Sequence, residues 1–252
     1  MSLRDKSILV TGGSRGLGLG LVEALAAQGA RITVVARGSA GLAEVKQRFG
    51  AATIAADVTD AAAAQRILAD VRPQILVLNA GATPPMGRLD QISWADFTAP
   101  WETDVRAGLA WMQAALNLPL APRSRVLVGS SGAAQQGSPL SGGYAGAKRM
   151  LWFMTRYAEG LSRQKGLGIR FQAILPLQIV GGTGVGDAAS GAYAQAAGIE
   201  REDFLARFGA PLPPRAFGDQ VVELLDDPRY DDGLAFGLKG GSGITVLEDA
   251  GA

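Results

Sequence analysis

The chain has 252 residues, of which 48% are hydrophobic and 19% are charged, and its formal net charge is +1. It contains no cysteine and no histidine, which excludes disulfides, thiol catalysis and a Ser-His-Asp triad. The same absence disfavours a zinc site, so we expect no bound metal. A net charge so close to zero predicts neither a nucleic-acid partner nor a membrane-surface partner.

The length and composition favour one globular domain over residues 1–252. The first residues are polar and lack the apolar core of a signal peptide. No uninterrupted apolar run is long enough to span a membrane. We therefore expect a soluble cytoplasmic protein.

Short apolar runs alternate with longer helical patterns along the chain. Strands are predicted at residues 7–11, 31–36, 52–56, 74–78, 125–129, 169–175 and 233–238. Helices are predicted at residues 19–28, 41–49, 60–71, 94–118, 141–165 and 218–226, with the fourth broken near Pro100. This alternation implies right-handed crossovers, so the expected fold class is α/β, a doubly wound parallel sheet of about seven strands with helices on both faces.

The segment around residues 177–215 interrupts this alternation. Between residues 181 and 214 it is rich in glycine, alanine and proline, and it is the least regular part of the chain. We expect it to be an insertion over one edge of the sheet, within the same domain.

Polar or turn residues follow the carboxyl ends of six predicted strands. In an open parallel sheet, ligands bind beyond these ends, near the point where the strand order reverses. The positions concerned are residues 11–18, Arg37, Asp57, residues 79–81, Ser131 and Pro176.

The turn after the first strand is rich in glycine. Gly12, Gly16 and Gly18 allow a sharp turn, close approach of the backbone to a ligand and tight packing of a helix on a strand. The helix that follows begins with free N–H groups and the positive end of its dipole, which suits a pyrophosphate. The alternative is a plain strand-to-helix turn.

Tyr144 and Lys148 are four residues apart in a predicted helix, so they lie one turn apart on the same face. An ammonium group held near a phenol favours the phenolate and lets the phenol act as an acid or a base. Ser131 ends the strand that precedes this helix. Alone, the Tyr-x-x-x-Lys spacing is weak, because it occurs by chance in many helices.

Gly12-x-x-x-Gly16-x-Gly18, Asn79-Ala80-Gly81, Ser131 and Tyr144-x-x-x-Lys148 together resemble the classical short-chain dehydrogenase/reductase family. The resemblance extends from about residue 5 to Pro176. It implies a single Rossmann-like domain that binds a nicotinamide dinucleotide and oxidises alcohols or reduces ketones. It also implies a homodimer or homotetramer.

The resemblance assigns a role to each residue of the expected site. Tyr144 would exchange a proton with the substrate oxygen, Ser131 would hydrogen-bond that oxygen, and Lys148 would hold the nicotinamide ribose and favour the ionised form of Tyr144. Ordinary packing, capping or solvated side chains are the alternatives. The residues expected to contact the cofactor are Gly12, Ser14, Arg15, Gly16, Leu17, Gly18, Arg37, Asp57, Val58, Asn79, Ala80, Gly81, Tyr144, Lys148, Pro176 and Ile179.

Two of these positions carry further information. Asp57 would lie beside the adenine, although it could instead form a helix-starting turn with Thr59. The residues after the second strand include Arg37 and no acidic residue, whereas an NAD enzyme commonly has a carboxylate there. Arg37, with Arg15 nearby, is suited to a 2′-phosphate, so NADP(H) is the preferred cofactor and NAD(H) the alternative.

The sequence departs from the family pattern at two places. In the best alignment Asp104 takes the place of an asparagine that supports a water beside the lysine, and an alignment shifted by one residue places Val105 there. The alternative for the Asp104 side chain is that it faces Arg106 or solvent. Pro176 is followed by Leu177 instead of glycine, which makes Ile179 the expected backbone contact for the nicotinamide amide and Thr183 a weaker candidate. We expect Asp104 to be part of the catalytic group.

The residues expected on the substrate side are mostly apolar, which favours a neutral or hydrophobic carbonyl or alcohol substrate. They are Ala133, Gln135, Leu177, Val180, Val185, Tyr193, Phe204 and Phe208. Packing of the insertion onto the sheet is the alternative for each. The function that we expect first is an NADP(H)-dependent carbonyl reductase or alcohol dehydrogenase. The second hypothesis is a weakly catalytic regulator that binds a dinucleotide, and the third is a methyltransferase.

Subunit contacts are expected on the two long helices at residues 94–118 and 141–165. Apolar residues there fit an interface between subunits and equally fit the core of the domain. Examples are Trp111, Met112, Trp152 and Phe153.

Overall fold

The computed structural model describes residues 2–248. Its strands form one eight-stranded sheet in the order β3-β2-β1-β4-β5-β6-β7-β8. All neighbouring pairs are parallel except β7 and β8, which are antiparallel. The strands are β1 (Ser7–Thr11), β2 (Arg31–Ala36), β3 (Ala52–Ala55), β4 (Ile75–Leu78), β5 (Arg125–Gly129), β6 (Arg170–Pro176), β7 (Ala235–Lys239) and β8 (Gly243–Val246).

The α/β class and the doubly wound parallel sheet are therefore confirmed. Strand β8 was not predicted from the sequence; it has only four residues and follows a tight turn of two glycines and a serine after β7. The strand order reverses between β1 and β4, so a crevice opens there at the carboxyl ends of the strands.

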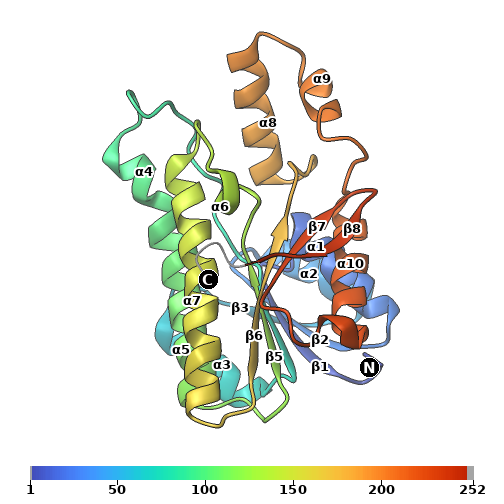
Figure 1. Ribbon diagram of the computed structural model, residues 1–252. Helices are drawn as coiled ribbons and strands as arrows, with labels where there is room; N and C mark the ends of the chain where they lie inside the picture. Colours follow the sequence, from blue (N-terminus) through green and yellow to red (C-terminus); the bar gives the residue numbers. More distant parts are fainter. Residues whose placement is uncertain (1, 249–252) are drawn as a thin grey trace.

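Helices cover both faces of the sheet (Figure 1). One core cluster joins β1 and β2 to α1 (Gly16–Ala27), α2 (Ser39–Phe49) and α10 (Pro214–Asp226). The other cluster joins the opposite face to α3 (Ala61–Val71), α5 (Arg106–Asn117) and α7 (Gly142–Gln164). Trp111, Met112 and Trp152 are buried, so they belong to the interior of the domain and not to an outer face of these helices.

Glycines let α1 and α10 pack closely together. A Cβ atom at Gly20 would overlap the carbonyl group of Pro214, and one at Gly218 would overlap the Gly20 carbonyl oxygen. The close packing fixes the start of α10 beside the glycine turn that opens α1. The chain segment that ends at α10 is thereby anchored near the crevice.

The long helix predicted after β4 is broken into three parts. It consists of α4 (Trp94–Pro100), a π-helical segment (Trp101–Val105) and α5. Pro100 lacks a backbone N–H, and a π-helical turn contains an extra residue, which changes the direction of the side chains that follow. Asp104 lies in this segment and is buried.

The segment predicted to be irregular contains two helices, α8 (Gly184–Ala197) and α9 (Arg201–Ala206). Figure 1 shows that they stand above the carboxyl ends of the strands, across from α4 and the short helix α6 (Ala133–Gln136). Thr183 caps α8, because its hydroxyl accepts a hydrogen bond from the N–H of Gly186. We call residues 184–208 the lid.

The remaining regular element is a short 3-10 turn (Pro228–Tyr230) between α10 and β7. Within residues 2–248, no helix is both long enough and apolar enough to cross a membrane.

Candidate active site

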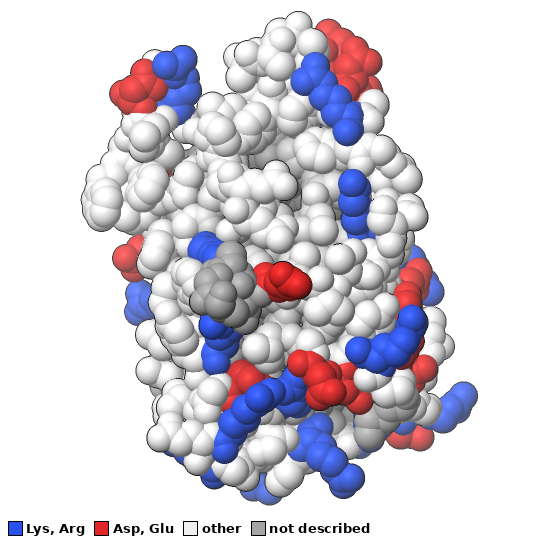
Figure 2. Space-filling model, in the orientation of Figure 1, with Lys and Arg blue, Asp and Glu red and all other residues white. Residues whose placement is uncertain are grey.

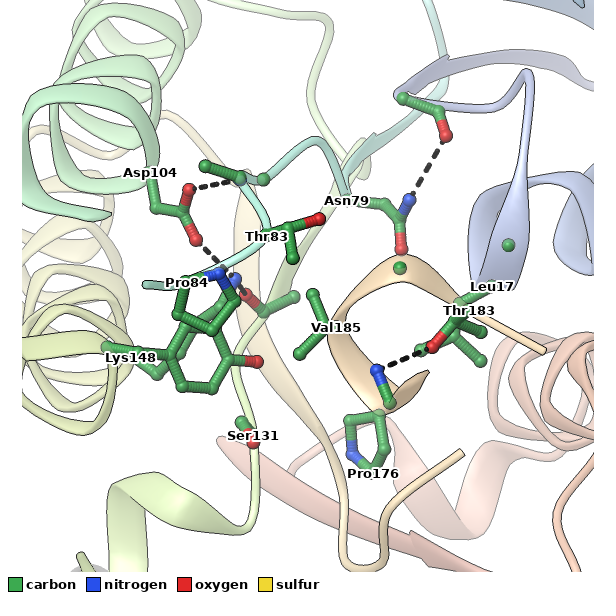
Figure 3. Close-up of a pocket in the computed structure, with 18 of the residues that line it drawn as sticks. Leu17, Asn79, Thr83, Pro84, Asp104, Ser131, Lys148, Pro176, Thr183 and Val185 are labelled. Carbon is green, nitrogen blue, oxygen red and sulfur yellow. Dashed lines mark hydrogen bonds and ion pairs between the residues drawn. The ribbon is translucent and has the colours of Figure 1, made fainter. Parts of the chain in front are cut away.

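A cavity of about 1130 Å³ opens at the carboxyl ends of the parallel strands. Small-molecule pockets commonly measure about 300–1,000 Å³, so this one has room for a ligand as large as a dinucleotide. Residues from the ends of β1 to β6 line it, together with residues of the lid. Figure 3 shows Asp104 and Lys148 on one side of the cavity and Leu17, Asn79 and Thr183 on the other.

The glycine turn between β1 and α1 forms the floor of one end. Gly12 and Gly16 have φ angles of 69° and 53°, which L side chains rarely adopt. A Cβ atom at Gly12 would also come within 2.7 Å of the Ala80 Cα atom. Gly18 lies beneath the turn, where a Cβ atom would overlap the Gly12 carbonyl oxygen, so it serves the packing of α1 and does not line the cavity. The other turn residues predicted to meet the cofactor line the cavity: Gly12, Ser14, Arg15, Gly16 and Leu17.

A threonine that the sequence analysis did not single out links this turn to the next strand end. The Thr11 hydroxyl accepts hydrogen bonds from the N–H groups of Asn79 at 3.1 Å and Ala80 at 3.2 Å. It donates to the carbonyl oxygen of Val77 at 3.3 Å. Asn79 in turn donates from Nδ2 to the Gly12 carbonyl oxygen at 3.4 Å. These bonds fix residues 79–81 against the glycine turn.

Lys148 and Asp104 form a buried ion pair. The Lys148 Nζ atom lies 3.0 Å from Asp104 Oδ2, and it also donates a hydrogen bond to the Gly129 carbonyl oxygen at 3.2 Å. Asp104 Oδ1 accepts hydrogen bonds from the Ala82 N–H at 2.8 Å and the Thr103 hydroxyl at 3.0 Å. The Asp104 side chain is fully buried and points toward Lys148, so the alternative orientation toward Arg106 or solvent is not the one in the structure.

This environment keeps Lys148 charged. Burial alone would lower the pKa of Lys148, but the Asp104 carboxylate and, to a smaller extent, Tyr144 oppose burial and raise the pKa above its ordinary value. The ammonium group lies 5.6 Å from the centre of the Tyr144 ring. A permanent positive charge therefore sits beside the phenol, with a carboxylate behind it.

Ser131 follows β5 and lines the same cavity as Tyr144 and Lys148. Its hydroxyl accepts a hydrogen bond from the Ala133 N–H at 3.3 Å. The neighbouring Ser130, which the sequence analysis did not name, is buried and donates from Oγ to the Lys148 carbonyl oxygen at 2.8 Å. This bond ties the end of β5 to α7, the helix that carries Tyr144 and Lys148.

The opposite end of the cavity is lined by Arg37, Asp57 and Val58. Asp57 Oδ1 accepts hydrogen bonds from both the N–H and the hydroxyl of Thr59, each at 2.9 Å. These bonds, the backbone one first, lower the pKa of Asp57. Asp57 thus forms the turn and lines the cavity at once. Arg15 and Arg37 are both exposed and both line the cavity.

The segment after β6, where Leu177 replaces the expected glycine, is held in place by the next residue, Gln178. Gln178 donates from Nε2 to the Ala210 carbonyl oxygen at 3.0 Å and accepts at Oε1 from the Gly240 N–H at 2.8 Å. It therefore holds the two ends of the lid region against the β7–β8 turn. Pro176 and Ile179 line the cavity, as do all eight residues expected on the substrate side.

Thr183, the weaker candidate for the amide contact, lines the cavity and caps the first helix of the lid. Its hydroxyl donates to the Val180 carbonyl oxygen at 2.8 Å and accepts from the Gly186 N–H at 3.0 Å. Its side chain lies over the glycine turn, because a Cβ atom at Gly16 would come 3.5 Å from the Thr183 methyl group. The first turn of the lid thus closes over the floor of the cavity.

Comparison with known proteins gives results consistent with this geometry. The sequence model of the family described as short chain dehydrogenase matches residues 6–189, well over half of the chain. The short chain dehydrogenase/reductase AacuD from Aspergillus aculeatus is 37% identical over 152 residues, which are 57% of this chain and 54% of that protein. The chain thus spans about half the length of AacuD.

Two further matches cover more of the sequence. Cis-2,3-dihydrobiphenyl-2,3-diol dehydrogenase from Rhodococcus globerulus is 30% identical over 204 residues, which are 74% of this chain and 68% of that protein. The crystal structure of a short chain dehydrogenase from Burkholderia cenocepacia in complex with NADP superposes with a TM-score of 0.73 at 26% identity. That superposition covers 94% of this chain and 97% of the other.

Proposed function

Because the chain belongs to the short-chain dehydrogenase family, we propose that it is an NADP(H)-dependent oxidoreductase that interconverts a carbonyl compound and the corresponding alcohol. The observation that carries this proposal is the meeting of Ser131, Tyr144 and Lys148 in one cavity with the glycine turn. A protein that only binds a dinucleotide has no need of the first three side chains. The match to an NADP-bound structure supports the same cofactor.

The lining of the cavity fits a dinucleotide. The left-handed glycines 12 and 16 leave the backbone of the turn open to a pyrophosphate, and the first N–H groups of α1 attract its negative charge. At the far end, two exposed arginines and no free acidic side chain after β2 suit the 2′-phosphate of NADP better than a 2′-hydroxyl. NAD(H) remains the alternative.

When bound, the dinucleotide supplies or accepts the hydride; the protein handles the proton. In reduction, Tyr144 donates its hydroxyl proton to the carbonyl oxygen as that oxygen gains negative charge. Ser131 hydrogen-bonds the same oxygen and stabilises the developing alkoxide. In oxidation, the Tyr144 phenolate accepts the proton. The Lys148 ammonium favours this phenolate electrostatically.

Asp104 acts in this scheme as a positioning residue. It holds the Lys148 ammonium from behind and joins it to the β4–α4 loop through the Ala82 N–H. Its negative charge also offsets part of the attraction between Lys148 and the Tyr144 phenolate. The natural protein should therefore need a higher pH for alcohol oxidation than a variant with a neutral side chain at this position.

A second function is favoured by the two departures from the family pattern, Asp104 beside the lysine and Leu177 in place of the glycine after Pro176. In that function the chain binds a dinucleotide and regulates a partner with little turnover. The exposed side chains of Leu109, Tyr157 and Leu161 on α5 and α7 also support a homodimer or homotetramer under either function.

One experiment separates the two functions. Purified protein is mixed with NADPH and a panel of neutral ketones and aldehydes, and loss of NADPH absorbance is followed alongside cofactor binding by fluorescence. We expect oxidation of NADPH with at least one carbonyl compound and none without it. Tight NADPH binding without oxidation across the panel would favour the regulator.

A further inference from the structure

Three aromatic rings of the lid form one continuous cluster beside the cavity. Tyr193 and Phe204 stack with their ring centres 5.7 Å apart and their planes at 3°. Phe208 meets Phe204 edge to face at 5.6 Å and 75°. All three line the cavity and are only partly buried, so each leaves aromatic surface open toward it. We call these residues the aromatic wall.

The position of this wall is fixed relative to the catalytic helix. The Tyr193 hydroxyl shares a hydrogen bond with Ser138 at 2.7 Å and accepts one from the Leu140 N–H at 3.2 Å. Ser138 also shares a hydrogen bond with Ser141, the residue before α7 begins. The polar end of Tyr193 is thus satisfied by protein groups, which leaves its ring as the part that meets a substrate.

Charge is confined to other parts of the cavity. The lid and the residues of α6 contribute only uncharged side chains to the lining. The charged side chains that line it belong to the strand ends and to the segments that follow them, and they are Arg15, Arg37, Asp57, Glu102, Asp104, Lys148 and Lys239. In Figure 2 the hollow between the two upper lobes is bordered mainly by uncharged residues. The lid does carry charged side chains, among them Arg207, which lies 6.0 Å from the centre of the Phe204 ring, but none of them is part of the cavity lining.

The geometry points to a cyclic ketone, or its alcohol, with a planar and uncharged ring system as the substrate. Its ring packs on the aromatic wall while its carbonyl oxygen reaches Ser131 and Tyr144, and Tyr193 determines the preference for planar rings. This inference rests on the proposed function. In the reduction, the hydride of NADPH forms the new C–H bond, the C=O π bond breaks, the Tyr144 proton forms the O–H bond, and NADPH becomes NADP⁺.

Two ketones with the same carbon skeleton test the ring preference. β-Tetralone contains a planar aromatic ring, and trans-β-decalone is its saturated counterpart of nearly equal size. We expect kcat/KM with NADPH to be higher for β-tetralone by about threefold to tenfold, the range that an aromatic pair contributes beyond its buried area. Equal values, or a preference for the decalone, would overturn the inference and leave the proposed function intact.

Substitutions in the aromatic wall test whether it causes the preference for β-tetralone. Tyr193→Leu and Phe204→Leu should each bring the ratio of the two kcat/KM values close to one. Tyr193→Phe keeps the ring and loses the bonds to Ser138 and Leu140, so it should keep the ratio while raising KM. Phe49→Leu removes an aromatic ring at the end of α2, away from the cavity lining, and should change nothing. A ratio unaffected by Tyr193→Leu and Phe204→Leu would contradict the assignment.

A binding measurement separates this inference from the proposed reaction. Calorimetry compares β-naphthol with trans-β-decalol, neither of which is reduced, on the protein saturated with NADPH. Tighter binding of the naphthol than of the decalol, if it is lost in Tyr193→Leu, supports recognition of planar rings. This holds even if no ketone is reduced, because the absence of reduction would contradict only the proposed reaction. Equal binding of the two compounds, or none of the naphthol, would overturn the inference.

Discussion

The carboxylate of Asp104 lies 3.0 Å from the ammonium group of Lys148, and both side chains are almost fully shielded from solvent. The pair is built by two elements distant in sequence, a π-helical turn and the second turn of α7. Gly81 makes room for it, since a Cβ atom there would come 2.9 Å from Asp104 Oδ2. The Lys148 ammonium group lies 5.6 Å from the centre of the Tyr144 ring. The positive charge of Lys148 and the negative charge of Asp104 therefore affect both the proton transfer at Tyr144 and the stability of the fold.

The first prediction concerns the pH dependence of alcohol oxidation. Asp104→Asn removes the negative charge and keeps the shape, so the Lys148 charge acts on Tyr144 without compensation. The pH profile of oxidation should therefore move to lower pH in the variant. Steady-state kcat and kcat/KM are measured between pH 6 and 10. A profile and rate identical to those of the natural protein would show that Asp104 does not act through Lys148.

The second prediction concerns folding stability. Asp104→Ala leaves a buried ammonium group without its partner, which should lower the free energy of unfolding by about 3–5 kcal/mol. Because the pKa of Lys148 is raised in the folded state, the pair stabilises the protein fully below the unfolded pKa of about 10.4 and loses that contribution only as pH rises through the folded value. In the variant, burial without the carboxylate lowers the pKa of Lys148, so in urea titrations the deficit should be largest near neutral pH and shrink as pH rises toward the unfolded pKa.

A double variant provides the control for this stability effect. Asp104→Ala combined with Lys148→Met removes both charges, so it should recover part of the loss seen in Asp104→Ala alone. If the two substitutions instead destabilise additively, the ion pair contributes nothing beyond packing, and the prediction is wrong.

How far the sequence could predict this site depends on the range of the interactions that build each part. The strands and the order of Tyr144, Lys148 and Ser131 follow from local apolar runs and from helical spacing, which the sequence displays directly. The direction of Asp104 depends on a π-helical turn after Pro100, and no local pattern announces the extra residue. The ion pair of Asp104 with Lys148 could therefore be found only from the three-dimensional structure.

The insertion over the sheet edge was predicted, but its two helices were missed for a compositional reason. Its helix α8 consists mainly of glycine and alanine and has only a weak apolar face, so its residues resemble a loop. The cap at Thr183 and the aromatic contacts of Tyr193 and Phe204 stabilise it through tertiary packing. Gly18 was predicted to contact the cofactor but lies under the turn. The spacing of three glycines in a motif does not show which of them faces the ligand.

The third prediction uses this difference between glycines. Gly18→Ala forces a methyl group into the Gly12 carbonyl oxygen, so it should cost about 1–3 kcal/mol of stability and weaken NADPH binding by displacing the turn. Gly160→Ala, on an exposed face of α7 with open space around it, should stabilise the protein by about 0.5–1 kcal/mol and leave NADPH binding unchanged. Thermal unfolding with and without NADPH measures both effects. Tolerance of Gly18→Ala would refute the packing assigned to it.

The fourth prediction concerns the choice of dinucleotide. Arg37→Ser removes paired charged donors from the end of the cavity proposed for the 2′-phosphate, so KM for NADPH should rise about tenfold to a hundredfold while KM for NADH stays the same. Arg66→Ser changes an exposed arginine of α3 outside the cavity lining and serves as the matched control. Equal losses with both cofactors, or better use of NADH by the natural protein, would argue against NADP(H).

The most direct test of the proposed reaction is the single-turnover rate of ketone reduction by Tyr144→Phe saturated with NADPH. The substitution removes only the hydroxyl that donates the proton, so the rate should fall by about a hundredfold to ten-thousandfold while NADPH affinity is retained. A variant that reduces the ketone at a rate close to that of the natural protein would contradict the role of Tyr144 and, with it, the proposed mechanism.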